Sequence, residues 1–546
     1  MKTRGLTRWV VVLVLALLIG LLLGYLNDRY HFFDSPLPPA APASTPAEGG
    51  TSAPLPTLSP TAEAAAPDPS PASNDELPAP TLFDVAWDDR ALWQDGWVEA
   101  VRDRANALTT ATVYHLQLTL ADDYRSFTGA QELRYTNNES DALNEIYFRL
   151  FPNLFDGSLT LDQLTLNGTP VEGVLELEES ALRLPLDEPL PPGQSVVITM
   201  RYEVEIPPVN EQNYGAFGWD NVTLALAHAY PLIPAYDESG WNIEIPPPSG
   251  DVIFADSSFY LVEIDAPADF VMALSGRVID EREAEGRRTV TVAAGPTRDF
   301  YLAGSEGWEE QQQQVGETLL RSYAFPENAA TNAETLRIGA ASVEAFNALV
   351  GPYPFTELEL AATPNLALGI EYPGVVVMTD RLYQQPNEEP WSLYLEPTVA
   401  HEVAHQWFYS TVGNDQLDAP WLDEALAQYL TFRYLRTTNA EAAAGFEASL
   451  QERWQRVGDA PIPIGLPVAA YTPQEYGAIV YGRGPLFFIE LESTLGTATL
   501  DDFLRNYYND NLFGIGTDAT LRASAEAACD CDLSEAWAEW VVPRER

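Results

Sequence analysis

The chain has little positive charge. Lysine occurs once, at Lys2, and 29 lysines and arginines stand against 80 aspartates and glutamates, so the 546 residues carry a formal net charge of -51. A surface of this sign repels nucleic acid and favours cationic or amine-bearing ligands. We therefore expect no nucleic-acid partner. A saline habitat or a genomic bias would give the same acidic excess, so the charge alone does not identify a substrate.

Cysteine is almost absent. The two cysteines, Cys529 and Cys531, are separated by one residue. Outside the cytoplasm they could close a small disulfide, and two thiols without a nearby histidine are too few to hold a structural zinc. We assign them no catalytic role. Internal repeats, phosphate-binding loops and dinucleotide motifs are also missing, so no motif points to nucleotide chemistry.

One long uncharged run lies close to the N-terminus. Residues 1–8 form a basic tail, and residues 9–26 are uncharged and rich in leucine and valine, close to the ~20 residues that cross a bilayer. Because no small-residue cleavage site or lipobox cysteine follows, the run favours an uncleaved transmembrane signal anchor. The catalytic part is then expected to be extracytoplasmic. Residues 27–81 are dominated by Pro, Ala, Ser and Thr, which predicts a disordered linker.

The remaining sequence divides by its periodicity. Residues 82–304 begin with a short helical lead at 91–108 and then alternate apolar and polar residues between turn signals, which predicts a large β-domain. Residues 305–546 mix helical patterns with short strand patterns. We therefore predict a multidomain α+β fold, in which an antiparallel β-domain precedes an α/β catalytic domain.

The clearest chemistry lies in the segment His401-Glu402-Val403-Ala404-His405. Two imidazoles one helical turn apart project from the same face, so they can offer two nitrogens to one Zn²⁺ while Glu402 stays beside the metal as a base. The chain has five histidines, and two of them lie in this turn. An isolated motif of this kind can also be a solvated helix face, so its surroundings decide between the two interpretations.

A second helix is expected to bring a third ligand. Residues 406–408 continue the first helix, residues 413–415 supply a turn, and Pro420 suits the first turn of a new helix. This arrangement folds Glu424 back against the two histidines, and a His₂Glu set with one open position for water is typical of a hydrolytic zinc site. We predict one Zn²⁺ per chain. Asp423 is either a hydrogen-bond acceptor for a ligand histidine or a charge at the helix N-terminus.

These residues resemble a known family. HEVAHQWF followed by PWLDEALAQY is similar to the HExxH-x18-E signature of the gluzincin zinc aminopeptidases, the group of aminopeptidase N and leukotriene hydrolase. Residues 368–374 resemble the exopeptidase motif GAMEN in its bacterial form, and the likeness runs from about Tyr114 to the C-terminus. It implies an N-terminal β-saddle or sandwich and a thermolysin-like catalytic domain. The resemblance is to a short bacterial-like form without the helical C-terminal domain that many members add.

The resemblance also implies roles for individual residues. Glu371 would bind the free α-ammonium of a peptide, and Tyr481 would donate its phenolic proton to the oxyanion of the tetrahedral intermediate. Taken alone, Glu371 is an ordinary turn acid and Tyr481 a core aromatic residue. The substrate-binding positions implied by the family are Glu371, Gly369, Ile370, Tyr372 and Tyr476.

The sequence thus predicts a membrane-anchored, zinc-dependent aminopeptidase that hydrolyses the N-terminal bond of extracytoplasmic peptides. Its partners would be peptides with a free N-terminus and, through the N-terminal helix, a membrane. Alternatives on the same scaffold are a zinc endopeptidase, an epoxide hydrolase and an inactive peptide-binding homologue. The family's side-chain preference does not carry over, because Leu368, Gly369, Ile370 and Tyr372 stand where the family usually has Gly, Ala, Met and Asn.

Overall fold

The computed structural model describes residues 82–247, 250–389 and 391–542. The predicted tail 1–8, membrane span 9–26 and linker 27–81 lie outside the described residues. Among the helices that are described, none has the length and apolar composition that a membrane crossing requires. The described residues belong to one compact unit, so the predicted domain boundary at 304/305 stays a prediction.

The helical lead consists of short pieces that pack on the following sheet. Trp93 donates its indole N–H to the carbonyl of Ala294 at 2.9 Å, and Trp97 donates to the carbonyl of Gly295 at 2.7 Å. Both tryptophans are fully buried, so the lead belongs to the core. Its elements are η1 (Leu82–Asp84), η2 (Ala91–Gly96), η3 (Glu99–Val101) and α2 (Arg102–Asn106).

An eight-stranded sheet is the main element of the N-terminal half. Its strands bury alternate side chains, as the period of two in the sequence predicts. The first strand pairs in parallel with its neighbour at Ser258–Pro267, so the sheet is mixed rather than purely antiparallel. In spatial order the strands are β15 (Arg277–Ala284), β16 (Arg287–Thr297), β13 (Ser258–Pro267), β1 (Val113–Leu120), β2 (Ser126–Thr136), β8 (Ser195–Glu205), β4 (Ser158–Leu166) and β5 (Thr169–Pro170).

Three smaller sheets complete the β-rich half. One sheet has four strands, one has three and one has two. They are β14 (Val271–Leu274), β17 (Leu302–Ser305), β10 (Leu224–Leu226) and β9 (Phe217–Trp219); β3 (Leu143–Arg149), β7 (Ala181–Leu190) and β6 (Val174–Glu176); and β11 (Tyr236–Asp237) with β12 (Gly240–Trp241). A short helix, η4 (Phe151–Leu154), follows β3.

A five-stranded sheet begins the C-terminal half. Strands β19, β20 and β22 run parallel, while both edge strands, β18 and β21, run antiparallel to their neighbours. In spatial order the strands are β18 (Glu309–Val315), β19 (Thr318–Ala324), β20 (Glu357–Thr363), β22 (Val375–Thr379) and β21 (Gly369–Tyr372).

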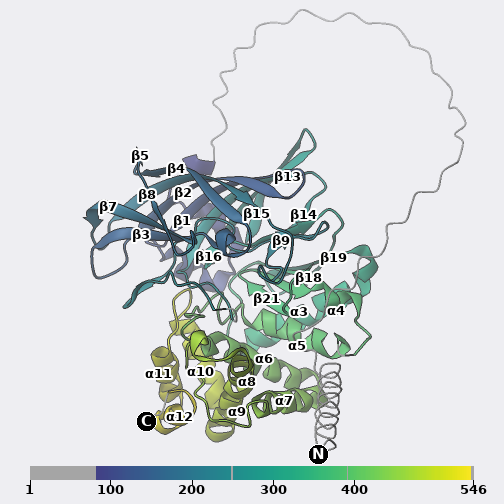
Figure 1. The fold of residues 1–546 in the computed structure, drawn as a ribbon. Helices are drawn as coiled ribbons and strands as arrows, with labels where there is room; N and C mark the ends of the chain where they lie inside the picture. The colour runs from purple at the N-terminus through teal and green to yellow at the C-terminus, as the bar shows by residue number, and fades with distance from the viewer. Residues whose placement is uncertain (1–81, 248–249, 390, 543–546) are drawn as a thin grey trace, which may run out of the picture. The chain divides into compact units, whose positions relative to one another are not determined.

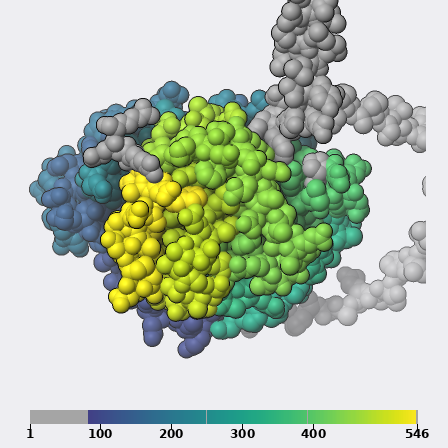
Figure 2. Space-filling view, turned by 90° about the horizontal axis from the view of Figure 1, so that it is seen from below, coloured from purple at the N-terminus to yellow at the C-terminus, as the bar shows by residue number. Residues whose placement is uncertain are grey.

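Helices make up the rest of the C-terminal half and share one large apolar core with the five-stranded sheet. Figure 1 shows them below the β-rich half, and in Figure 2 green-to-yellow residues of the C-terminal half cover the face that is seen from below. The helices are η5 (Pro326–Asn328), α3 (Ala329–Leu349), α4 (Asp380–Gln384), α5 (Trp391–Ala404), α6 (Trp421–Thr438), α7 (Ala440–Gln455), η6 (Val468–Ala470), α8 (Pro473–Ala478), η7 (Ile479–Arg483), α9 (Gly484–Leu495), α10 (Thr497–Asp510), α11 (Asp518–Cys529) and α12 (Ser534–Trp540).

The fold is therefore α+β, with a β-rich N-terminal part and a largely helical C-terminal part. The finer names, β-saddle and thermolysin-like, stay predictions. The disulfide that the two cysteines could close is present between Cys529 and Cys531, at the end of α11.

Candidate active site

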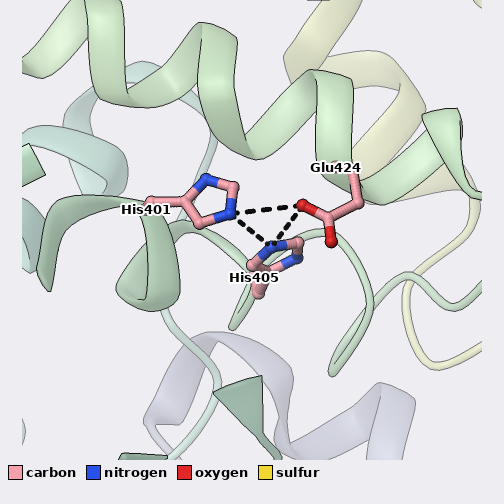
Figure 3. Close-up of side chains that lie close together, drawn as sticks. All are labelled: His401, His405 and Glu424. Atoms are coloured by element: carbon pink, nitrogen blue, oxygen red, sulfur yellow. Dashed lines mark hydrogen bonds and ion pairs between the residues drawn. The ribbon is translucent and has the colours of Figure 1, made fainter. Parts of the chain in front are cut away.

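Two histidines and one glutamate converge where α5 meets α6. The Nε2 atoms of His401 and His405 lie 3.3 Å apart, and Glu424 Oε2 lies 3.2 Å from the first and 3.4 Å from the second. All three atoms face a common point (Figure 3). The α5–α6 connection therefore folds Glu424 back as the sequence predicts.

The three atoms have the spacing of a metal site. Zn–N distances of ~2.0–2.1 Å in a tetrahedron put neighbouring ligand atoms about 3.3 Å apart. Glu424 Oε2 is buried and has no hydrogen-bond partner in the described part of the chain, a costly state that a cation would relieve. The donor set of two imidazoles and one carboxylate fits zinc. No further ligand is needed for a catalytic site, since the fourth position belongs to water.

Helix α5 ends earlier than the sequence predicts. It ends at Ala404, and residues 406–408 do not continue it. The chain turns back because the N–H of Ser410 binds the carbonyl of His405, and Thr411 Oγ1 donates to the carbonyl of Gln406. The N–H of His405 still binds the carbonyl of His401 at 3.3 Å, so the two imidazoles remain one turn apart.

Gln406 is a residue of this turn to which the sequence analysis gave no function. Its Nε2 donates to the carbonyl of Tyr372 at 3.1 Å, and its Oε1 accepts from the N–H of Gly374 at 2.9 Å. One buried amide thus fixes the segment after Glu371 to the segment after His405. Its place beside the histidine motif is the only signal that the sequence offers.

Glu402 and Gly369 lie in direct contact. Glu402 is buried on α5, and a Cβ atom added to Gly369 would collide with its Cγ, Cδ and Oε1 atoms. Ligand atoms of Glu371, Glu402 and His405 all lie within 4.8 Å of one another. The predicted base and the predicted amine-binding acid therefore stand on the same side of His405.

Successive side chains of strand β21 point to opposite sides of the sheet. Gly369 and Glu371 face the histidines, whereas Ile370 and Tyr372 face a separate apolar cluster. The ring of Tyr372 stacks on that of Tyr301 at a centroid distance of 3.7 Å. The side chains of Ile370 and Tyr372 therefore point away from His405, and the contribution of these two positions to substrate binding stays a prediction.

Asp423 lies in the first turn of α6, and its hydrogen-bond partners are amide groups. Its Oδ2 accepts a hydrogen bond from Gln416 Nε2 at 2.9 Å, and its Oδ1 accepts from the N–H of Glu424 at 2.8 Å. Among the described residues, no hydrogen bond joins Asp423 to an imidazole, and Nδ1 of His405 pairs with the carbonyl of Phe408 at 3.2 Å instead. Asp423 therefore supports the first turn of α6 rather than a ligand ring.

Gln416 was missed by the sequence analysis. Its Nε2 also lies 3.3 Å from Glu371 Oε1, so one amide bridges the carboxylates of Glu371 and Asp423. The side chain is buried, and its Oε1 atom has no hydrogen-bond partner among the described residues. A glutamine in a turn gives no sequence signal, because the turn itself explains its polarity.

The two predicted tyrosines form one wall of the site. Tyr481 lies in the π-helical turn η7 and donates its hydroxyl to Glu424 Oε1. The ring of Tyr476 packs edge-on against that of Tyr481 at a centroid distance of 5.6 Å, and its buried hydroxyl has no partner in the described part of the chain. Burial and the charge of Glu424 hold the pKa of Tyr481 well above its ordinary value, so it remains a proton donor.

The carboxylates perturb one another strongly. Burial and the charge of Glu371 raise the pKa of Glu402, and burial and the charge of Glu424 raise that of Asp423 to about 7. Burial disfavours the charged form of Glu424 as well, but the adjacent imidazoles of His401 and His405 outweigh this effect and lower its pKa. The site thus concentrates negative charge in a buried space, which favours positively charged ligands.

Comparison with known proteins agrees with this geometry. Residues 336–540 match the peptidase family M1 domain. The chain is 25% identical over 303 residues to "Aminopeptidase M1" of Arabidopsis thaliana. The alignment covers 52% of this chain and 33% of that protein. It is also 25% identical over 350 residues to "Aminopeptidase N" of Lactobacillus delbrueckii subsp. lactis. This alignment covers 56% of this chain and 39% of that protein. The chain therefore spans between a third and two fifths of these relatives.

Solved structures share the fold. A mutant of the M1 zinc metallopeptidase from Deinococcus radiodurans superposes with a TM-score of 0.58 at 20% identity, covering 80% of this chain and 96% of that chain. Another structure of that metallopeptidase, with a TM-score of 0.56 and 20% identity over 80% of this chain and 96% of that one, is described as bound to a Tyr-Ser-Ala substrate. The β-rich half and the helical half occur together in these proteins as they do here.

Proposed function

The chain belongs to peptidase family M1 through its domain at residues 336–540, and from this premise we propose that it is a zinc-dependent aminopeptidase that removes N-terminal residues from peptides. The family implies a zinc cofactor, and the His401, His405 and Glu424 atoms have the spacing and chemistry to hold it. The M1 zinc metallopeptidase that was solved with a tripeptide substrate supports peptides as the substrate class.

The observation that carries the proposal is the position of Glu371 beside the ligand group. Its carboxylate lies within 4.8 Å of the ligand atoms of Glu402 and His405. A residue of peptide spans at most ~3.3–3.6 Å, so an α-ammonium held by Glu371 brings the first peptide bond, and not a later one, to the zinc ligands. A carboxylate in a buried site binds an ammonium strongly, which makes a free N-terminus a requirement.

The mechanism follows from the roles of the chain's own residues. A bound zinc would supply a Lewis acid and a water whose pKa is lowered to ~7. Glu402 takes a proton from the attacking water and passes it to the leaving amine; its raised pKa suits this transfer. Tyr481 offers its hydroxyl to the oxygen on which negative charge develops. Since no serine or cysteine nucleophile is involved, no acyl-enzyme forms.

The test is hydrolysis of a panel of aminoacyl reporters, with and without chelator. We expect cleavage of free-amine reporters, loss of cleavage after chelation, recovery with added zinc, and no cleavage once the amine is acetylated. Equal cleavage of acetylated and free reporters would instead identify an endopeptidase. Absence of bound zinc together with absence of chelator-sensitive hydrolysis would fit a binding protein.

We also propose that residues 9–26 anchor the protein in a membrane, with the catalytic part outside the cytoplasm. The support is the uncharged run of the sequence and the basic residues before it. Carbonate extraction of membranes tests the anchor, and protease protection of intact cells tests the side. Release of the full-length chain by carbonate would contradict the proposal.

A further inference from the structure

A loop of the β-rich half reaches the active site and carries an acid that the mechanism does not use. Asp251 lies between β12 and β13 and is half-buried. The preceding Gly250 adopts a φ of +85°, and a Cβ atom there would lie 3.0 Å from the hydroxyl of Tyr476 and 3.2 Å from Val468. The loop therefore packs against the tyrosine wall of the site.

The carboxylate of Asp251 is electrostatically part of the site. Burial and the charges of Glu371, Glu424 and Asp423 raise its pKa well above the ordinary value. Its own charge acts on Tyr476 and Tyr481. Within the described residues, no arginine forms an ion pair with Asp251 and no side chain donates a hydrogen bond to it. The carboxylate therefore has no cationic partner among these residues, and a substrate cation can supply one.

Two further polar atoms at the same place lack partners. The hydroxyl of Tyr476 is buried beside Gly250, and Tyr476 is 6% exposed. Oε1 of Gln416 is buried beside Glu371, and Gln416 is 1% exposed. Buried polar atoms of this kind are normally hydrogen-bonded, so both indicate room for a polar ligand rather than a sealed core.

We propose that Asp251 binds the side-chain cation of an N-terminal arginine or lysine, so that the enzyme prefers peptides that begin with a basic residue. The side chain of the first residue leaves the carbon atom next to the α-ammonium. Asp251 follows Gly250, which packs against Tyr476, and the charge of Glu371, the residue proposed to bind that ammonium, acts on Asp251. The inference rests on the proposed aminopeptidase function and adds the substrate class.

The test compares arginyl and citrullinyl reporters with the zinc-loaded full-length protein. Citrulline has nearly the shape of arginine and no charge, so the ratio of the two kcat/KM values isolates the cation. We expect the ratio to be at least about tenfold, as for a charge-assisted hydrogen bond in a buried site. In Asp251→Asn the ratio should fall to near one, and in Asp251→Glu it should stay above that of the asparagine variant.

Binding gives a second readout that does not depend on turnover. In the Glu402→Gln background, calorimetry should show that an arginyl dipeptide binds at least about tenfold more tightly than a citrullinyl dipeptide, and that the difference disappears when Asp251→Asn is added. Glu238→Gln, which removes an exposed acid of the same β-rich half, is the matched control and should leave the ratio unchanged.

The outcomes separate the two proposals. If the wild-type protein cleaves neither reporter nor any other free-amine reporter, the aminopeptidase function fails. If it cleaves arginyl and citrullinyl reporters equally well, the function stands and the role of Asp251 is overturned. An unchanged ratio in a folded Asp251→Asn protein would overturn that role as well.

Discussion

At the scale of single residues, the site depends on a few polar atoms held in buried positions. The Nε2 atoms of His401 and His405 and the Oε2 atom of Glu424 lie 3.2–3.4 Å apart. Glu402 and Glu371 stand beside them on different elements. Each of these residues therefore has a separable function that a conservative substitution can isolate.

Glu402→Gln should keep zinc and lose turnover. The amide has the shape of the carboxylate but cannot accept a proton, and general acid–base catalysis contributes roughly 10²–10⁴-fold. Metal analysis and kcat on a free-amine reporter measure the two properties in one preparation. A variant with normal kcat would remove Glu402 as the base.

Gln416→Leu should weaken substrate binding more than it weakens turnover. The amide bridges Glu371 and Asp423 at 3.3 and 2.9 Å, and without it the two carboxylates lose a shared donor and repel each other. We expect KM for free-amine reporters to rise several-fold, with a smaller change in kcat and full zinc content. A fall in zinc content with unchanged KM would show that Gln416 supports α6 instead.

At the scale of elements, three local features bring the site together. Helix α5 ends at Ala404, strand β21 turns only alternate residues toward the histidines, and the π-helical turn η7 presents Tyr481 to Glu424. An extra residue in a helical turn commonly marks a functional site, because it redirects one side chain.

Gly369→Ala should impair catalysis without unfolding the protein. The added methyl group would occupy the space of the Glu402 side chain, which must then move, and a displacement of about 1 Å can cost about 10²-fold in rate. Steady-state kinetics and a thermal unfolding scan test this. Gly445→Ala is the matched control, since a Cβ atom at Gly445 meets nothing within 4 Å and alanine favours a helix. Normal kcat in Gly369→Ala would show that Glu402 has room to shift.

At the scale of the whole described unit, buried polar side chains join its two halves. Arg298 of the β-rich half donates to the carbonyls of Tyr409 and Ala255 at 2.9 and 3.0 Å and also to that of Gly514, so it fixes the chain that follows His405. Glu359 on β20 accepts the N–H of Leu274 on β14 at 2.6 Å. The site therefore depends on contacts between parts that are distant in sequence.

The stability of the protein should depend on pH through Glu359. Burial raises the pKa of this carboxyl to about 8 from its ordinary value of 4.5. Between these values the folded state holds a proton that the unfolded state has released, so the contribution to the free energy of unfolding is full below pH 4.5 and is lost as the pH rises toward 8. In Glu359→Gln this contribution is absent, and the unfolding free energy should fall less between pH 5 and 8.

Chemical unfolding at several pH values measures this difference. Glu309→Gln is the control, because it removes the same charge from an exposed position on β18, an edge strand of the same sheet. A Glu359→Gln protein with the same pH dependence as the wild-type protein would show that Arg321, 3.5 Å away, keeps Glu359 ionised.

The sequence by itself predicted the group of His401, His405 and Glu424 that the structure brings together, and the order of a β-rich part followed by a largely helical part. A helical turn fixes the spacing of His401 and His405, and the eighteen residues before Glu424 are enough to turn the chain back. These features depend on residues that are close together in the sequence, so hydrophobic periodicity and motif spacing are enough to predict them. The membrane span and the linker are sequence predictions that lie outside the described residues.

Only the tertiary structure decided which other groups face the ligands. It ended α5 at Ala404, turned Ile370 and Tyr372 away from the site, gave Asp423 the amide of Gln416 as its partner, and placed Asp251 among the site's charges. The packing of Tyr372 and the surroundings of Asp251 depend on residues tens or hundreds of positions away. The end of α5 and the partner of Asp423 depend on turns whose geometry is fixed by the surrounding fold. A local pattern carries no information about such a contact, because burial and charge at one position are set by whatever the rest of the chain packs against it.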